Sequence, residues 1–420
     1  MKNKILAIIC TILVCLPLIT KATPFYAIFD EKSFIEYINK ENITKENFLN
    51  LPSEKLVEDF EYYFKTMKEN SPLFNATKRH VLDLEKQFKD YKKKISESKS
   101  NFEQLSLIDE FSRKFLGHNG IILGDCSYYI NFYNSWDGDV RKVWAKILTD
   151  DPLTQRNTDL YNCFKWKKER PELQDSTPKK SNENIETKII DPEKIAYIKV
   201  KSFENENIGP HDEKIIGEFF EKTKYFDNII IDITGNFGGS TNYSYYFAPI
   251  LKHDLIYNQY TLFKMGPQST SYVETGYEGK IQPIDELPDF PNLNPEDIKE
   301  LTHFIKHSYH YKPLKNSVNA KIWLLIDEEV FSASEYFAIL CKQGKTGTIV
   351  GRNSRGDGVG IDPVYLVLPN SKVALRYSVD YGLNEDGSCN AECGTKPDIV
   401  SPDGEDPLTT CLKAIKANQN

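Results

Sequence analysis

The sequence lacks the features that mark several common classes of protein. Basic residues do not dominate, because 53 Lys and Arg stand against 61 Asp and Glu, a formal net charge of −8. Phosphate binding needs a basic surface, so this balance argues against a nucleic-acid partner. The glycine-rich stretch at residues 232–240 contains neither Gly-Lys-Ser/Thr nor G-x-G-x-x-G spacing, which leaves nucleotide binding there with little support. No apolar run has a comfortable membrane-spanning length.

The one long apolar run lies at the N-terminus. Lys2 and Lys4 precede the apolar residues 5–20, and Lys21 and Ala22 follow them. This pattern predicts a secretory signal peptide over residues 1–22, cleaved after Ala22. Neither cysteine of the run follows the small residue that a bacterial lipid anchor requires. We therefore expect a secreted or periplasmic protein that has no membrane span once the signal peptide is removed.

Cysteine is sparse in the remaining chain. Six cysteines are left, namely Cys126, Cys163, Cys341, Cys389, Cys393 and Cys411. Their number is even and export permits disulfides, but the connectivity cannot be read from the sequence. Apart from the Cys389/Cys393 pair their spacing is irregular, which gives little support for a zinc ribbon. We predict no metal and no cofactor.

The hydrophobic pattern divides the mature chain into three parts. With 420 residues, 40% of them hydrophobic, the chain can form two or three domains. Residues 23–116 are predicted to form a helical domain, in which apolar residues recur at three- and four-residue steps behind Ser53, a plausible N-cap. Residues 117–190 form a connecting region that ends in a polar linker, and residues 191–416 form the core.

The core alternates predicted strands with predicted helices. Residues 195–203, 228–234 and 320–327 have strand patterns, whereas residues 212–226 and 242–253 have helical ones. This β/α order predicts an α/β fold with helices covering the sheet. Residues 254–319 are too polar and proline-rich for a core and are predicted to be an insertion.

Two stretches of the core carry residue types that suit catalysis. In "FSASE", residues 331–335, Ser332 or Ser334 either caps the helix that follows or serves as a nucleophile beside free helix N–H groups. In "DITGNFGGS", residues 232–240, three glycines follow a strand. They either form a tight turn or offer bare N–H groups to an anion.

Five stretches, taken in order, resemble the core of the C-terminal-processing (tail-specific) serine peptidases. They are "YIKVKSF", "NIIIDITGNFGGS", "WLLIDEEVFSASEYFA", "TIVGRNSRG" and "ECGTKPDI". "VEDFEYYFKTMKENSPLF" resembles the helical N-terminal domain of their bacterial relatives. The resemblance runs from about residue 51 to residue 412. It implies a ββα-spiral core of the ClpP/crotonase type, with Ser332 as the nucleophile.

The general base divides this family into two branches. Where the processing-protease branch has a Lys, this chain has Asp357, so a Ser-Lys dyad is not available from that position. The branch similar to the tricorn core protease and the retinoid-binding-protein repeats uses a His before the core and a Glu after it. This resemblance implies that His118 is the base and Glu392 the supporting acid for Ser332.

The same resemblance implies an oxyanion hole made of the backbone N–H groups of Gly238, Gly239 and Ala333. Two residues depart from the family pattern. Thr234 stands where the family usually has Arg, and Gly117 stands where the tricorn branch has a Ser beside its His. The carboxylate-binding glycine loop of a PDZ domain is not found, so recognition of substrate C-termini is not implied.

These features predict an exported serine endopeptidase that cleaves protein or peptide substrates through an acyl-enzyme intermediate. The alternative is a non-catalytic protein of the same fold that binds a peptide or an apolar ligand. We also predict a Cys389–Cys393 disulfide that would fix the Glu392 loop, with pairing of these cysteines elsewhere as the structural alternative.

A metal enzyme is a further rival. His303, His307 and His310 stand at i, i+4 and i+7, which would place them on one face of a helix. No Glu follows His303 as in H-E-x-x-H, so a solvated helix with incidental histidines is the favoured interpretation.

Overall fold

The structure is a computed structural model that describes residues 39, 41–122, 126–134, 142–169, 184–192, 194–203, 209–250, 253–276, 280–313 and 317–418. The predicted signal peptide and most of the predicted polar linker lie outside these residues. No helix within the described ranges combines the length and the apolar character that crossing a bilayer requires.

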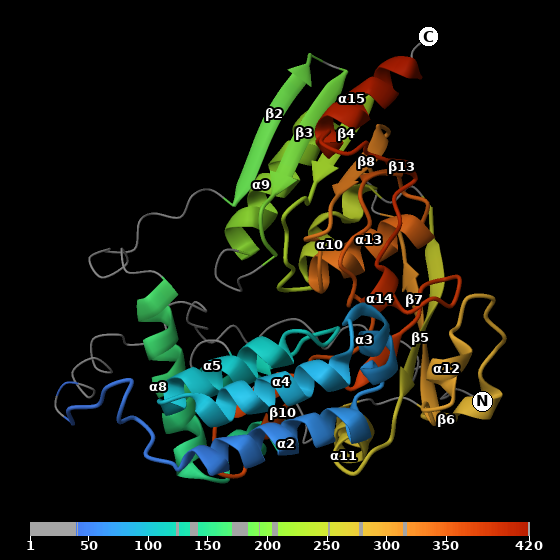
Figure 1. The fold of residues 1–420 in the computed structure, drawn as a ribbon. Helices are drawn as coiled ribbons and strands as arrows, with labels where there is room; N and C mark the ends of the chain where they lie inside the picture. The colour runs from blue at the N-terminus through green and yellow to red at the C-terminus, as the bar shows by residue number, and fades with distance from the viewer. Residues whose placement is uncertain are drawn as a thin grey trace, which may run out of the picture.

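A six-stranded sheet forms the centre of the core, in the upper part of Figure 1. Its strands follow the order β13-β9-β8-β4-β3-β2, and all neighbours are parallel except the antiparallel edge pair β2–β3. All five residues of β4 are buried, as expected for a parallel strand covered on both faces. The predicted α/β class is thus confirmed. The strands are β2 (Ile185–Asp191), β3 (Ile195–Val200), β4 (Asn228–Asp232), β8 (Lys321–Ile326), β9 (Thr348–Gly351) and β13 (Ile399–Val400).

Helices cover both faces of this sheet. Side chains alternate along a strand, so Ile229 and Ile231 of β4 point to one face and Ile230 to the other. The first face packs against α9 (Gly209–Thr223) and α13 (Ala333–Gln343), and the second against α15 (Pro407–Ala417).

The helix predicted over residues 242–253 is much shorter in the structure. Among the described residues of this stretch, only α10 (Tyr243–Tyr246) and a 3-10 turn, η2 (Ala248–Ile250), are helical. Pro249 explains the difference, because proline has no N–H to continue the helical hydrogen bonds.

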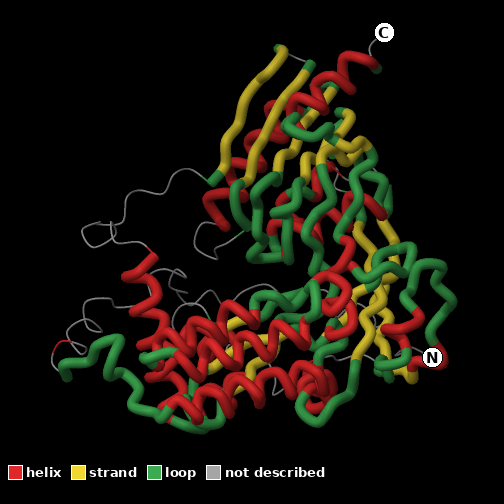
Figure 2. The backbone as a smooth tube through the Cα atoms, in the orientation of Figure 1, coloured by secondary structure: helices red, strands yellow, loops and turns green. Residues whose placement is uncertain are grey.

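The N-terminal helices share one apolar core with a three-stranded antiparallel sheet of order β1-β11-β10. Figure 2 shows these helices gathered in the lower part of the molecule, apart from the strands of the larger sheet. This apolar core of the helical region therefore extends past residue 116, the predicted end of the helical domain, since residues on both sides of that boundary pack together. These elements are α2 (Ser53–Asn70), α3 (Phe74–His80), α4 (Leu84–Glu97), α5 (Asn101–Ser112), β1 (Gly120–Ile121), α6 (Cys126–Asn134), α7 (Lys142–Thr149), α8 (Pro152–Glu169), β10 (Val364–Val367) and β11 (Ala374–Tyr377).

Ser53 does not cap α2, so this prediction was wrong. Pro52 holds the N-cap position, and Ser53 is the first residue of the helix. The Ser53 hydroxyl donates to the Ser96 carbonyl at 3.2 Å and accepts from Gln104 Nε2 at 2.7 Å. It therefore joins helices to one another instead of ending one.

Residues 254–319 are built around a second antiparallel sheet of order β12-β5-β7-β6. The helix predicted for the three histidines is wrong, because they lie in strand β7. A strand places His303 and His307 on one face and His310 on the other, and His310 Nε2 lies 2.7 Å from Asp254 Oδ2. The elements of this region are β5 (Leu255–Phe263), α11 (Ser269–Gly276), β6 (Gln282–Pro283), η3 (Ile284–Glu286), α12 (Pro295–Ile298) and β7 (His303–Tyr311), joined by β12 (Asp380–Gly382).

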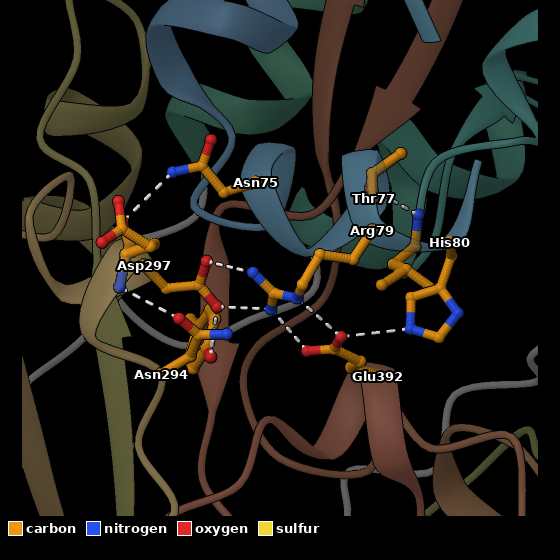
Figure 3. A network of polar contacts seen from close by, with 10 residues as sticks. Asn75, Thr77, Arg79, His80, Asn294, Asp297 and Glu392 are labelled. Carbon is orange, nitrogen blue, oxygen red and sulfur yellow. Dashed lines mark hydrogen bonds and ion pairs between the residues drawn. The ribbon is translucent and has the colours of Figure 1, made fainter. Parts of the chain in front are cut away.

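An ion network ties the helical region to this sheet and to the core (Figure 3). Arg79 of α3 donates two hydrogen bonds to the buried Asp297 of α12, both 2.7 Å long. It donates two more, of 2.9 and 2.6 Å, to Glu392 of α14 (Asn390–Cys393). One side chain thus joins three segments that are far apart in the sequence.

Candidate active site

Ser332 lies between strand β8 and helix α13 in an unusual backbone conformation. Its φ is 58° and its ψ is −120°, a combination that costs energy for a residue with a side chain and that is concentrated at functional sites. Its backbone N–H donates to the Gly356 carbonyl at 3.1 Å, and its carbonyl accepts from Tyr336 at 2.8 Å. These bonds hold the turn, so the strained conformation is fixed by its surroundings.

The two serines of the motif have different roles in the structure. Ser334 is buried, donates to the Asn236 carbonyl at 2.6 Å and accepts from the Phe331 N–H at 3.1 Å. Ser332 is partly exposed, occupies the N-cap position without capping, and its hydroxyl bonds to no residue that the structure describes. Ser334 is therefore structural, and the Ser332 hydroxyl remains available for chemistry.

His118 lies against Phe331, the residue before this serine, although the two are distant in sequence. It follows α5, and its ring packs on the ring of Phe331 with a centroid distance of 4.5 Å. Its backbone N–H donates to the Ser378 hydroxyl at 2.9 Å. The structure thus brings together the predicted base and the residue that precedes the predicted nucleophile.

The carboxylate beside His118 is Asp357 and not Glu392. Asp357 Oδ2 lies 2.5 Å from His118 Nδ1, and the Asp357 side chain is 8% exposed. Glu392 instead bonds to Arg79 and lies 3.1 Å from His80 Nε2, as Figure 3 shows. The structure therefore does not place the predicted supporting acid at the base. From the sequence, Asp357 is notable only because it stands where the processing-protease branch has its general-base lysine, and no role is predicted for it.

Two further acids are buried behind this pair. Glu335 is fully buried, and its Oε1 accepts from Asn390 Nδ2 at 2.7 Å and from Thr395 Oγ1 at 2.8 Å. Burial raises the pKa of Glu335 to about 7. Burial, with the charge of Asp357 as the next cause, raises the pKa of Asp380 well above its usual range. The cluster therefore favours states in which not all of its carboxyls are charged.

The glycine turn lies directly against Ser332. A Cβ atom on Gly238 would meet the Phe331 carbonyl oxygen at 2.5 Å and both the Ser332 Cβ and the Ala333 nitrogen at 2.9 Å. The N–H of Gly238 donates to Asn236 Oδ1 at 2.9 Å, whereas those of Gly239 and Ala333 have no partner in the described part of the chain. Of the three predicted oxyanion donors, Gly239 and Ala333 thus present free N–H groups. Gly238 instead lets the glycine turn approach the Ser332 backbone closely.

The predicted disulfide is absent, because Cys389 and Cys393 are both thiols in the structure. The segment between them forms one turn of helix, in which the Cys393 N–H donates to the Cys389 carbonyl at 2.9 Å. Arg79, and not a covalent ring, holds Glu392.

The arrangement of side chains suits acid–base chemistry better than metal binding. Within the described ranges, no three His, Cys, Asp or Glu side chains gather into a group that could hold a metal ion. A hydroxyl, an imidazole and a carboxylate are instead grouped beside free backbone N–H donors, as acyl transfer requires.

The close approach of Gly238 gives a testable expectation. Gly238→Ala should abolish activity, because the new methyl group would overlap Ser332 and because the φ of 95° is strained for alanine. Gly235→Ala is the matched control, since it also places an alanine at a positive φ, 77°, but its new Cβ would meet no atom nearer than 3.7 Å. Hydrolysis rates and thermal melting of both variants measure the difference. Equal losses of activity would show that the close approach has no special role.

Comparison with known proteins gives the family. Residues 194–401 match Peptidase family S41. A candidate peptidase from Parabacteroides merdae ATCC 43184 is 20% identical over 88% of this chain and 97% of that chain, with a TM-score of 0.52. Mature CPAF complexed with lactacystin is 11% identical over 88% and 98% of the two chains, with a TM-score of 0.53. At these identities the structural likeness shows the fold alone. No curated protein matches the sequence significantly. Through residues 194–401, the chain belongs to peptidase family S41, and it is a serine peptidase of the family that its sequence motifs resemble.

Proposed function

We propose that this protein is an exported endopeptidase in which Ser332 is the nucleophile, His118 the general base and Asp357 the acid that orients the base. The observation that carries the proposal is the contact of 2.5 Å between His118 Nδ1 and Asp357, made by a histidine whose ring packs on Phe331, the residue before a strained serine. With Nδ1 held by a carboxylate, the other ring nitrogen, Nε2, is the one left to accept a proton.

In the first half of the reaction, His118 Nε2 takes the proton of the Ser332 hydroxyl while Oγ attacks the peptide carbonyl carbon. The N–H groups of Gly239 and Ala333 donate to the resulting oxyanion. The tetrahedral intermediate then collapses, the C–N bond breaks, and the imidazolium gives its proton to the leaving amine. This leaves an ester between Ser332 and the substrate acyl group.

In the second half, a water molecule attacks the ester carbonyl and His118 accepts its proton. The ester C–O bond breaks, Ser332 recovers its proton and the carboxylic acid product leaves. The free enzyme makes no Ser332–His118 hydrogen bond within the described residues. Such bonds often form only when substrate is bound.

Removal of either reacting side chain tests the proposal. Ser332→Ala and His118→Ala should each lower kcat against a peptide library by a factor on the order of 10⁴ to 10⁶. Both changes shorten partly exposed side chains, so thermal melting should remain close to that of the wild type. A non-catalytic binding protein is the alternative, and peptide hydrolysis that survives both substitutions or is absent from the wild type would contradict the proposal.

A comparison of two acids tests which carboxylate supports the base. Asp357→Asn should lower kcat by a factor on the order of 10⁴, because an amide cannot hold His118 in the tautomer that accepts a proton. Glu392→Gln should keep kcat within a few-fold and lower the free energy of unfolding by about 1–2 kcal/mol, because it weakens the bonds to Arg79. The reverse pattern, with Glu392 essential and Asp357 dispensable, would restore the assignment that the family resemblance implies.

Export is the remaining part of the proposal, and residues 1–22 support it by their pattern alone. Expression of the full chain in a bacterial host with a Sec pathway should release a protein that begins at residue 23. N-terminal sequencing of the periplasmic and medium fractions measures this. Recovery of only uncleaved protein in the cytoplasm would contradict it.

A further inference from the structure

Arg355 is an exposed cation that contacts the residue preceding the candidate nucleophile. It belongs to the loop between β9 and β10, and its guanidinium carbon lies 5.0 Å from the centroid of the Phe331 ring. Phe331 directly precedes Ser332, and its ring also packs against His118. One aromatic ring therefore contacts both the base and this arginine.

The position of Arg355 is fixed although its side chain is exposed. Its backbone N–H donates to the Val330 carbonyl at 2.8 Å, and the neighbouring Gly356 carbonyl accepts from Ser332 at 3.1 Å. Contact with an aromatic ring restricts the side chain as well, since a guanidinium is attracted to the ring face. The cation is thus held in place before any ligand arrives.

No residue in the described part of the chain neutralises this guanidinium, which makes neither a hydrogen bond nor an ion pair there. The nearby carboxylates are already engaged. Asp357 contacts His118, Glu335 accepts from Asn390, and Asp380 accepts from the backbone of Ile361.

Arg352 in the same loop shows the contrast. It is only partly exposed, its Nη2 donates to the Glu405 carbonyl at 3.1 Å, and its Nη1 lies 3.9 Å from Glu328. Arg352 therefore has a structural role in this loop, whereas Arg355 is left with its hydrogen-bond donors facing solvent.

We propose that Arg355 determines specificity by binding an acidic side chain, Asp or Glu, of the substrate near the bond that is cleaved. The proposal rests on the peptidase function above and adds a substrate class to it. A guanidinium presents paired N–H donors that match a carboxylate, which makes such contacts strong and selective.

The position of the acidic residue in the substrate follows from chain geometry. Summing the guanidinium-to-ring distance, the length of the Phe331 side chain, one Cα–Cα step and the length of the Ser332 side chain puts the cation within about 16 Å of the Ser332 hydroxyl. An extended peptide covers that distance in about four or five residues. The acidic residue should therefore lie within about five positions of the cleaved bond.

Peptides that differ only in charge test the proposal in turnover. A library with blocked termini locates a cleaved sequence, and Glu or its neutral isostere Gln is then placed at each position within five residues of the cleaved bond. The wild type should prefer Glu to Gln at one position by about tenfold to a hundredfold in kcat/KM. Arg355→Gln should remove this preference, Arg355→Lys should keep part of it, and Arg352→Gln, which removes the same charge nearby, should leave it intact.

Binding to an inactive protein separates failure of this proposal from failure of the function. Fluorescence anisotropy with Ser332→Ala measures the affinity for members of the same library and for matched Glu and Gln peptides without any turnover. The affinity should favour Glu by a similar factor, less so at high salt, and the preference should disappear in the Ser332→Ala/Arg355→Gln double variant. Equal affinities for Glu and Gln peptides at every position, or a preference that survives Arg355→Gln, would overturn the specificity role. A binding preference without hydrolysis by the wild type would overturn the peptidase function alone.

Discussion

The contact between His118 and Asp357 is the interaction on which the candidate site depends. His118 belongs to the loop that leaves the N-terminal helices, whereas Asp357 belongs to a loop of the core, 239 residues later. Neither loop contains a complete set of catalytic groups, so the site exists only while the helical region is docked on the core. The shared apolar core of the helices with β10 and β11, and the Arg79 ion network, are what keep these parts together.

Around this contact, close packing sets the geometry of the nucleophile. Gly238 leaves no room for a side chain beside Ser332, and Ser334 fixes the turn through the Asn236 and Phe331 backbones. The strained φ and ψ of Ser332 are the result, and they direct its hydroxyl away from the capping position that a serine there would usually take. Burial raises the pKa of Glu335 and of Asp380 and so favours their neutral forms. Little negative charge therefore accumulates behind Asp357.

The parts of the fold with strong local patterns could be predicted from the sequence. Strands β4 and β8 are short apolar runs, and the strand–turn–helix around Ser332 needs no knowledge of distant residues. Long-range contacts could not be predicted in this way. The motif order implied Glu392 as the partner of the base, but Arg79 from a distant helix binds that carboxylate, and only the folded chain brings Asp357 to His118. The spacing of His303, His307 and His310 suited a helix, yet pairing of β7 with β5 made it a strand.

The most direct test of this account is to identify the residue that reacts with a fluorophosphonate probe. Intact mass and peptide mapping of the labelled wild type should show a single adduct on Ser332, formed much more slowly in His118→Ala and in Asp357→Asn. An adduct on another residue, or labelling of Ser332 at an unchanged rate in both variants, would contradict the central claim that the His118–Asp357 pair activates this serine.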